Sequence, residues 1–238
     1  MSVRLLFPLT VFERDMLDPK WSDRQGVTPE YLEQLRQEMD RMRQKDPQGR
    51  RVSNAYTGWQ SNDSVETNHV FAPLMRKIKA VFDEEVFPYH GIDMGVCQMT
   101  MGNCWANING FGAWNRPHLH NGCWFSGAFY IAADGDEGDI EFIDTDAKVV
   151  SDFPYSPRNA CSHNHAPRSG QLLLFPSGAM HMVSPNYTEK ERYSVAFNIN
   201  LQYLGNGDRN GNIPDYNPDE FCFDIGKDGN PILSNDSN

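Results

Sequence analysis

Short apolar runs separated by turn residues fill the chain after Met94, and this pattern limits the folds open to it. Gly, Asn, Asp and Pro lie between the runs, so each run has the length of a strand and not of a typical helix. Many short strands joined by tight turns are typical of an antiparallel sandwich or barrel. The sequence therefore predicts a mainly β fold. The runs are CQMTMGNCWANI, CWFSGAFYIA, GDIEFID, GQLLLFP, HMVSP and RYSVAFNINLQYL.

An edge strand and two helices are expected before these runs. Residues 4–14 mix alternating apolar positions with a proline, which favours an edge strand. Residues 28–46 have Thr28 as a candidate N-cap, Pro29 in the first turn, and apolar residues at helical spacing. Residues 71–86 also carry an apolar stripe. We expect both helices to pack on the outside of the sheet.

The whole chain of 238 residues is expected to form one domain. The helices before the strands do not form an obvious core of their own, and the chain has no internal repeat. We therefore divide residues 1–238 into helical support in 1–93, a β core in 94–204, and a loop-rich C-terminal tail in 205–238.

Composition argues against several classes of partner. A net charge of −11 disfavours a nucleic-acid surface, which needs clustered Lys and Arg. No segment is long and apolar enough to span a bilayer, and the first apolar run is broken by Pro8. The five cysteines are scattered and form no CxxC pair, as expected of reduced thiols. We expect a cytoplasmic protein with no nucleic-acid or membrane partner, and a homodimer is left open.

Two histidines in the stretch NRPHLHNG suggest a metal site. His118 and His120 are separated by one residue, so on a strand they would share a face. Each neutral imidazole offers one nitrogen lone pair to a metal. A metal site needs at least a third ligand. His181 is the candidate, because it follows a predicted strand and turn and opens the next strand. We predict His118, His120 and His181 as metal ligands and as the catalytic centre.

Four stretches of the chain carry a resemblance to a known family. They are GWQS (58–61), HLHNGCWFSGAFYI (118–131), FPSGAMHMVSP (175–185) and ERYSVAFNIN (191–200). These stretches resemble the 2-oxoglutarate/Fe(II)-dependent oxygenases, in particular an uncharacterised bacterial and phage group related to prolyl hydroxylases, and the resemblance covers most of the chain from Leu6 to Leu204. It implies a double-stranded β-helix, or jelly roll, with Fe(II) and 2-oxoglutarate as cofactors. It further implies that molecular oxygen is used to hydroxylate a small-molecule or peptide substrate.

Arg192 and Ser194 are the expected 2-oxoglutarate contacts. Arg192 lies eleven residues beyond His181, and period-two alternation puts Ser194 on the same strand face. A guanidinium fork can hold the far carboxylate of 2-oxoglutarate with two hydrogen bonds. Asn107 and Tyr130 are further candidates for binding this co-substrate. The alternative for Arg192 is an exposed strand arginine.

The resemblance departs from the family pattern at one position. His120 stands where these oxygenases usually have a carboxylate. We predict a three-histidine site, with Glu141 or Asp144 as the alternative third ligand and His120 as its neighbour. A second pair, His163 and His165, is interpreted as part of a loop near the site.

The histidine segments also resemble the two cupin motifs, except that the glutamate expected after the histidine pair is absent. Two alternatives to the oxygenase therefore remain. One is a cupin-type three-histidine dioxygenase or isomerase that does not use 2-oxoglutarate. The other is a metal-binding jelly roll without catalysis.

Overall fold

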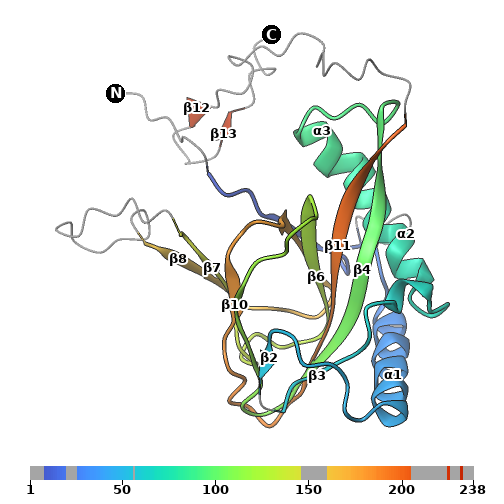
Figure 1. Ribbon diagram of the computed structural model, residues 1–238, viewed down its shortest axis with the longest axis vertical. Helices are drawn as coiled ribbons and strands as arrows, with labels where there is room; N and C mark the ends of the chain where they lie inside the picture. The colour runs from blue at the N-terminus through green and yellow to red at the C-terminus, as the bar shows by residue number, and fades with distance from the viewer. Residues whose placement is uncertain are drawn as a thin grey trace.

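The computed structural model describes residues 8–19, 26–55, 57–145 and 160–204, with two short backbone strands beyond them (Figure 1). The predicted tail of 205–238 otherwise lies outside the described residues, as does Cys222. The helical segments are α1 (Pro29–Lys45), the 3₁₀ turn η1 (Val65–Thr67), α2 (Ala72–Val81), the π-helical turn η2 (Phe82–Val86) and α3 (Phe87–Tyr89).

The strands include one for each predicted apolar run, with bounds that agree to within a few residues. They are β1 (Phe12–Asp15), β2 (Asn54–Ala55), β3 (Trp59–Gln60), β4 (Cys97–Asn109), β5 (Trp114–His118), β6 (Phe125–Ala132), β7 (Ile140–Ile143), β8 (Ser162–His165), β9 (Gln171–Pro176), β10 (His181–Val183), β11 (Arg192–Tyr203), β12 (Asp224–Ile225) and β13 (Pro231–Ile232).

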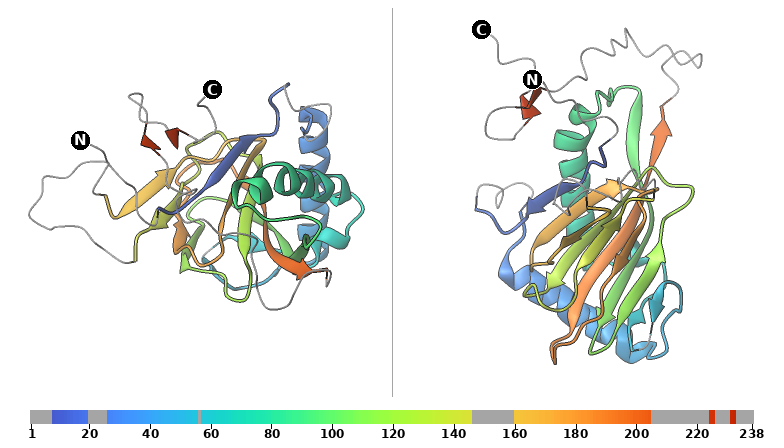
Figure 2. Two further views of the ribbon diagram at one scale, coloured as in Figure 1. Left: turned by 90° about the horizontal axis from the view of Figure 1, so that it is seen from above. Right: turned by 90° about the vertical axis from the view of Figure 1, so that its left-hand side faces the viewer.

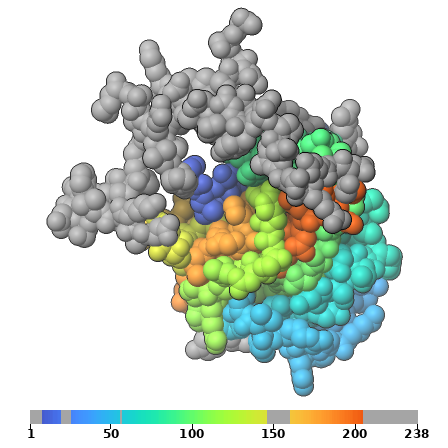
Figure 3. All heavy atoms as spheres, turned by 45° about the horizontal axis from the view of Figure 1, so that its top comes forward, coloured from blue at the N-terminus to red at the C-terminus, as the bar shows by residue number. Residues whose placement is uncertain are grey.

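Two antiparallel sheets form the body of the molecule (Figures 1 and 2). The six-stranded sheet has the order β1-β9-β6-β11-β4-β3, and the five-stranded sheet has the order β2-β5-β10-β7-β8. The edge position predicted for the first strand is confirmed, because β1 pairs with β9 and with no other described strand. Its dark blue segment is visible on the surface of the face shown in Figure 3. The predicted jelly-roll class is confirmed by this arrangement of two sheets.

Strand alternation gives the six-stranded sheet two different faces. Along β11, Tyr193, Val195, Phe197 and Ile199 enter the core shared with the helices. Along β9, Leu172 and Leu174 enter that same core, whereas Leu173 and Phe175 enter a second core between the sheets. The run LLLF is therefore continuously apolar because both faces of β9 are covered.

The helices cover the outer face of the six-stranded sheet, on the far side of β4 and β11 from β10 (Figure 1). Helix α1 begins as predicted, because the Thr28 hydroxyl accepts a hydrogen bond of 3.2 Å from the Tyr31 N–H. The second predicted helix is confirmed, and it continues through η2 into α3. Within the described ranges, no helix combines the length and apolarity that crossing a membrane requires.

Two short strands among residues 1–93 were not predicted beside the expected edge strand and helices: β2 pairs with β5, and β3 pairs with β4. A strand of two residues is too short to show a period-two pattern. The pair of His163 and His165 lies on strand β8 and not in a loop. Pairing with β7 makes this polar segment a strand, and the sheet edge tolerates its exposed polar side chains.

Gly127 on β6 supports a testable prediction about packing. A Cβ atom there would lie 2.4 Å from Cζ of the buried Phe197 and 2.9 Å from the carbonyl oxygen of Leu173. Gly127→Ala should therefore lower the free energy of unfolding by about 1–3 kcal/mol, measured by urea denaturation. Gly178→Ala is the control, since a Cβ there meets nothing within 4 Å. Equal stability of the two variants would contradict this packing argument.

Candidate metal centre and anion cavity

Three histidines from two neighbouring segments meet at one end of the five-stranded sheet. His118 ends β5, His181 begins β10, and the two residues are register partners. The ring centroids of His118 and His181 are 4.3 Å apart, and each lies 5.2 Å from the centroid of His120. One nitrogen from each ring lies within 4.8 Å of the others. The structure thus brings together the three side chains predicted as ligands.

The reason that His118 and His120 share a direction differs from the prediction. Strand β5 ends at His118, so His120 lies beyond the strand and alternation does not orient it. The His120 N–H instead donates a hydrogen bond of 2.9 Å to the Ser177 carbonyl oxygen. This bond ties the segment after β5 to the turn before His181.

All three rings use Nδ1 for a hydrogen bond inside the protein. Each Nδ1 faces a carbonyl or amide oxygen, which can only accept, so the proton lies on Nδ1 and the Nε2 lone pair is free. The pairs are His118 with the Arg116 carbonyl at 2.6 Å, His181 with the Ala179 carbonyl at 2.9 Å, and His120 with Asn198 Oδ1 at 2.5 Å.

Burial keeps these imidazoles neutral. It lowers the pKa of His181 to about 3, with the adjacent His118 adding to the effect. The pKa values of His118 and His120 are also lowered, mainly by burial. Neutral imidazole is the form that binds a metal. Three neutral imidazoles, each with one ring nitrogen within 4.8 Å of the others, therefore fit a divalent transition metal such as Fe(II).

The alternative carboxylate ligands do not lie in this group. Among the described residues, the cluster of potential metal ligands consists of the three histidines alone. Alternation along β7 directs Ile140 and Phe142 into the core, so Glu141 lies on the opposite face. Asp144 follows the end of the same strand. His163 and His165 are also outside the histidine group.

A cavity runs from the histidines between the two sheets. The residues predicted to bind 2-oxoglutarate all line it, and they lie on three adjacent strands of the six-stranded sheet. Ser194 on β11 pairs with Tyr130 on β6 and with Asn107 on β4. The lining residues from the prediction are Asn107, Tyr130, Arg192 and Ser194.

Arg192 places a positive charge deep in this cavity. Only 3% of the residue is exposed, so the alternative of an exposed strand arginine is wrong. Its Nη1 donates hydrogen bonds of 2.9 and 2.6 Å to the carbonyl oxygens of Glu137 and Gly138. None of the ion pairs within the described ranges includes Arg192. Burial lowers its pKa, as expected of a cation held away from water.

Other groups in the cavity are ready to bind a polar ligand. Burial raises the pKa of Tyr130 to about 12, so its hydroxyl stays protonated and can donate a hydrogen bond. The Oδ1 atoms of Asn107 and Asn109 are buried and lack a hydrogen-bond partner. Buried polar atoms without partners are uncommon in native proteins. These two oxygens can accept from a ligand that donates, whereas Arg192 and the Tyr130 hydroxyl can donate to an anion, so we call this space the candidate anion cavity.

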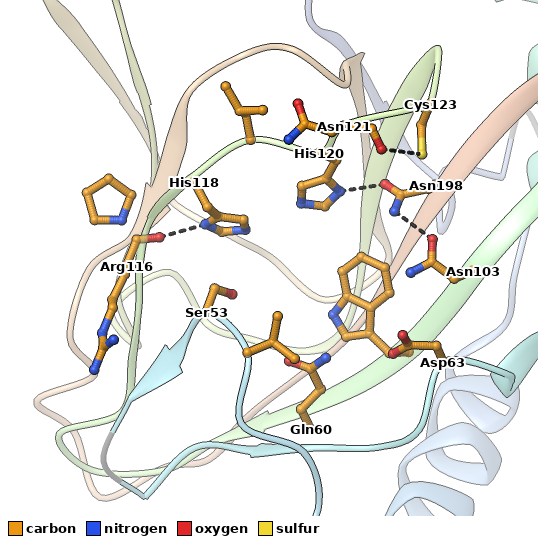
Figure 4. Close-up of a pocket in the computed structure, with 14 residues that line it drawn as sticks. Ser53, Gln60, Asp63, Asn103, Arg116, His118, His120, Asn121, Cys123 and Asn198 are labelled. Carbon is orange, nitrogen blue, oxygen red and sulfur yellow. Dashed lines mark hydrogen bonds between the residues drawn. The ribbon is translucent and has the colours of Figure 1, made fainter.

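A second, more open cavity of about 450 Å³ adjoins His118 and His120 (Figure 4). The sequence prediction missed the polar residues that line it. Alternation provided a usable signal for two of them, because Asn198 shares a face with Arg192 and Asn103 shares one with Asn107. The missed lining residues include Gln60, Asp63, Asn103, Trp105, Arg116 and Asn198.

Residues 103–198 match the sequence model of the family described as "Putative 2OG-Fe(II) oxygenase". The match spans the three histidines and Arg192. The match covers less than half of the chain and agrees with the family resemblance predicted from the sequence. A comparison with curated proteins found no match.

Solved structures share the fold at low sequence identity. A prolyl hydroxylase from Trichoplax adhaerens, solved with a hypoxia inducible factor peptide fragment, is 15% identical, with a TM-score of 0.52 over 81% of this chain and 82% of that one. The viral collagen prolyl hydroxylase of Paramecium Bursaria Chlorella virus-1, solved with 2-oxoglutarate, is 13% identical, with a TM-score of 0.51 over 79% and 94%. At such identities the likeness establishes the fold.

Removal of one histidine tests the metal centre. His181→Ala should weaken Co(II) binding by more than the roughly 10–100-fold that loss of a ligand's hydrogen-bond partner costs, because a ligand itself is lost. Isothermal titration calorimetry measures the affinity. His163→Ala is the matched control, since His163 is exposed on β8, and it should bind as the wild type does. Wild-type affinity in His181→Ala would show that the cluster is not the metal site.

Proposed function

We propose that the protein is a non-haem Fe(II) and 2-oxoglutarate-dependent dioxygenase that hydroxylates a small polar substrate. His118, His120 and His181 would hold the iron through Nε2. The geometry that supports this role is the approach of three neutral rings, each with Nδ1 already engaged. When bound, Fe(II) and 2-oxoglutarate supply oxygen activation, which is coupled to decarboxylation of the co-substrate.

The observation that carries the co-substrate proposal is the buried Arg192. A buried cation with no ion pair among the described residues is strongly unfavourable, and a ligand carboxylate would relieve that cost. Tyr130 and Ser194 would add hydroxyl hydrogen bonds to the same carboxylate, since the two residues are register partners that line the cavity. The cupin alternative offers no reason to keep a charge there.

The same residues fix the direction in which 2-oxoglutarate would bind. Arg192 would take its far carboxylate, and the keto acid end would point toward the histidines that line the same cavity. Core residues such as Phe175 and Ile140 also line this cavity, and their apolar side chains limit water around the reacting end. The chain thus positions the co-substrate and limits its contact with solvent.

The open cavity beside His118 and His120 is proposed as the substrate pocket. Its volume of about 450 Å³ lies in the usual range for small-molecule sites, roughly 300–1,000 Å³. Gln60 is buried, and its amide points into the pocket (Figure 4) without a hydrogen-bond partner among the described residues. Asp63 and Arg116 add one charge of each sign to the lining. This lining favours a polar substrate, either a small molecule or part of a peptide.

Three finer features of the prediction belong to this proposal. A cytoplasmic location is supported by the scattered cysteines, and the absence of a nucleic-acid partner by the net charge of −11. A homodimer is left open as the assembly, because small closed sandwiches often pair.

One experiment separates the three candidate functions. Addition of 2-oxoglutarate to the anaerobic Fe(II) protein should produce a visible charge-transfer band. A protein that binds iron but shows no spectral change would be a cupin-type enzyme, which retains the metal without this co-substrate. Succinate release on a panel of polar substrates would then exclude a jelly roll that binds metal without catalysis.

A variant of Arg192 tests the anion cavity. Arg192→Met removes the charge and keeps an apolar chain, so 2-oxoglutarate should lose two hydrogen bonds of about 1.5–3 kcal/mol each. Titration of the visible band should show at least about 100-fold weaker 2-oxoglutarate binding, with Fe(II) affinity unchanged. The exposed Arg168→Met is the control. Loss of both affinities, or of neither, contradicts the assignment.

A further inference from the structure

His120 differs from the other two histidines in what holds its ring. Backbone carbonyl oxygens accept the Nδ1 protons of His118 and His181, whereas two side chains face Nδ1 of His120. The nearer is Oδ1 of Asn198, on β11 in the opposite sheet, at 2.5 Å; the other is the Ser126 hydroxyl at 3.1 Å, which donates its own proton to Asn198 and so can only accept from the ring. His120 is also the residue that stands in place of the usual carboxylate. His120, the least typical predicted ligand, therefore has a hydrogen-bond partner, the Asn198 side chain, that can be removed by mutation.

Three hydrogen bonds fix the Asn198 amide. Its Oδ1 accepts from His120 Nδ1 at 2.5 Å and from the Ser126 hydroxyl at 2.8 Å. At the other end, Nδ2 donates to Asn103 Oδ1 at 2.7 Å (Figure 4). Asn198 and Ser126 are buried, so these bonds form away from water. The amide is thus held at both ends.

Strand pairing explains why these groups meet. Asn198 on β11 is the register partner of Ser126 on β6. On its other side, the register of β11 with β4 shifts between Phe197 and Ile199, so β4 contains an extra residue there. Such a bulge changes the direction of nearby side chains. Asn103 lies within this irregular stretch, and its carboxamide reaches the Asn198 amide.

The direction of this amide controls the proton on His120. With Oδ1 toward the ring, Nδ1 must carry the proton and Nε2 keeps its lone pair. If the amide were reversed, its N–H would face Nδ1 and the proton would lie on Nε2, where it blocks coordination. Asn103 opposes the reversal, because its Oδ1 requires a donor from Asn198.

We propose that Asn198, held by Asn103 and Ser126, is a positioning residue that keeps His120 in the tautomer able to bind metal through Nε2. A neutral histidine can then serve at the position where related oxygenases use a carboxylate. The inference deepens the proposed function, because it concerns the same three-histidine centre. It does not depend on the use of 2-oxoglutarate.

The first test reads the tautomer without metal. Nitrogen chemical shifts of ¹⁵N-labelled histidine in the metal-free protein distinguish a protonated Nδ1 from a protonated Nε2. Wild type and Asn198→Asp should show His120 protonated at Nδ1, because both supply an acceptor. Asn198→Ala should show a mixture of tautomers. An unchanged His120 signal in Asn198→Ala would overturn the proposal.

The second test measures Co(II) affinity by calorimetry. Asn198→Ala should bind roughly 10–100-fold more weakly than wild type, the usual cost of losing a ligand's hydrogen-bond partner. Asn198→Asp should bind at least as tightly as wild type, since its carboxylate accepts the same bond and adds negative charge near the metal. Asn200→Ala, two residues along the same strand, is the control and should not change the affinity. Equal weakening in Asn198→Asp and Asn198→Ala would overturn the proposal.

A third variant separates control of the amide direction from simple packing. Asn103→Ala leaves Asn198 in place and removes the acceptor that opposes its reversal. It should give a mixed His120 tautomer and weaker Co(II) binding, and Asn103→Asp should restore both. Failure of this rescue would contradict the proposed role even if Asn198→Ala did not fold. If Co(II) binds normally and 2-oxoglutarate gives no visible band, the co-substrate proposal fails while these results still decide the role of Asn198.

Discussion

The alternation of side chains along β11 is the constraint on which both the core and the site depend. Its odd-numbered residues from Tyr193 to Ile199 pack under the helices, and its even-numbered residues from Arg192 to Asn198 face the cavity. A register slip of one residue would exchange the two sets, placing apolar rings in the cavity and a buried charge in the core. The hydrophobic packing of the helices therefore also fixes the position of the chemical groups.

The histidine centre and the anion cavity depend on different sheets. His118 and His181 belong to the five-stranded sheet, whereas Arg192, Tyr130 and Asn107 belong to the six-stranded one. The helices leave the space between the sheets free, because they pack on the other face of the six-stranded sheet. The packed core between β11 and the helices stabilises the molecule, and the cavity between the two sheets holds the buried polar groups of the site.

The main strands, the first helix and the histidine group could be predicted from the sequence, because each has a local signal. The features that were missed depend on contacts between segments far apart in the chain. Long apolar runs and the Thr28 cap are local signals, so β4, β11 and α1 were found. The grouping of His118, His120 and His181 followed from motif spacing, although a hydrogen bond to Ser177, and not strand alternation, orients His120. Contacts between strands that are far apart in the sequence, such as that of Asn198 with Asn103, leave no local sequence pattern. The histidines of β8 were misplaced because pairing with β7 outweighed their polar composition.

The bond between His120 and Asn198 also joins the two sheets across the site. The predicted metal ligands lie mainly on the five-stranded sheet, and Arg192 lies on the six-stranded one. The distance between the sheets therefore limits the length of any molecule that contacts both. Sheets facing each other pack about 10 Å apart, and a tie across the opening resists sliding of one layer over the other. Under the proposed function, the framework would thus set the length of acid that fits between the histidines and Arg192, before any contact with the ligand is made.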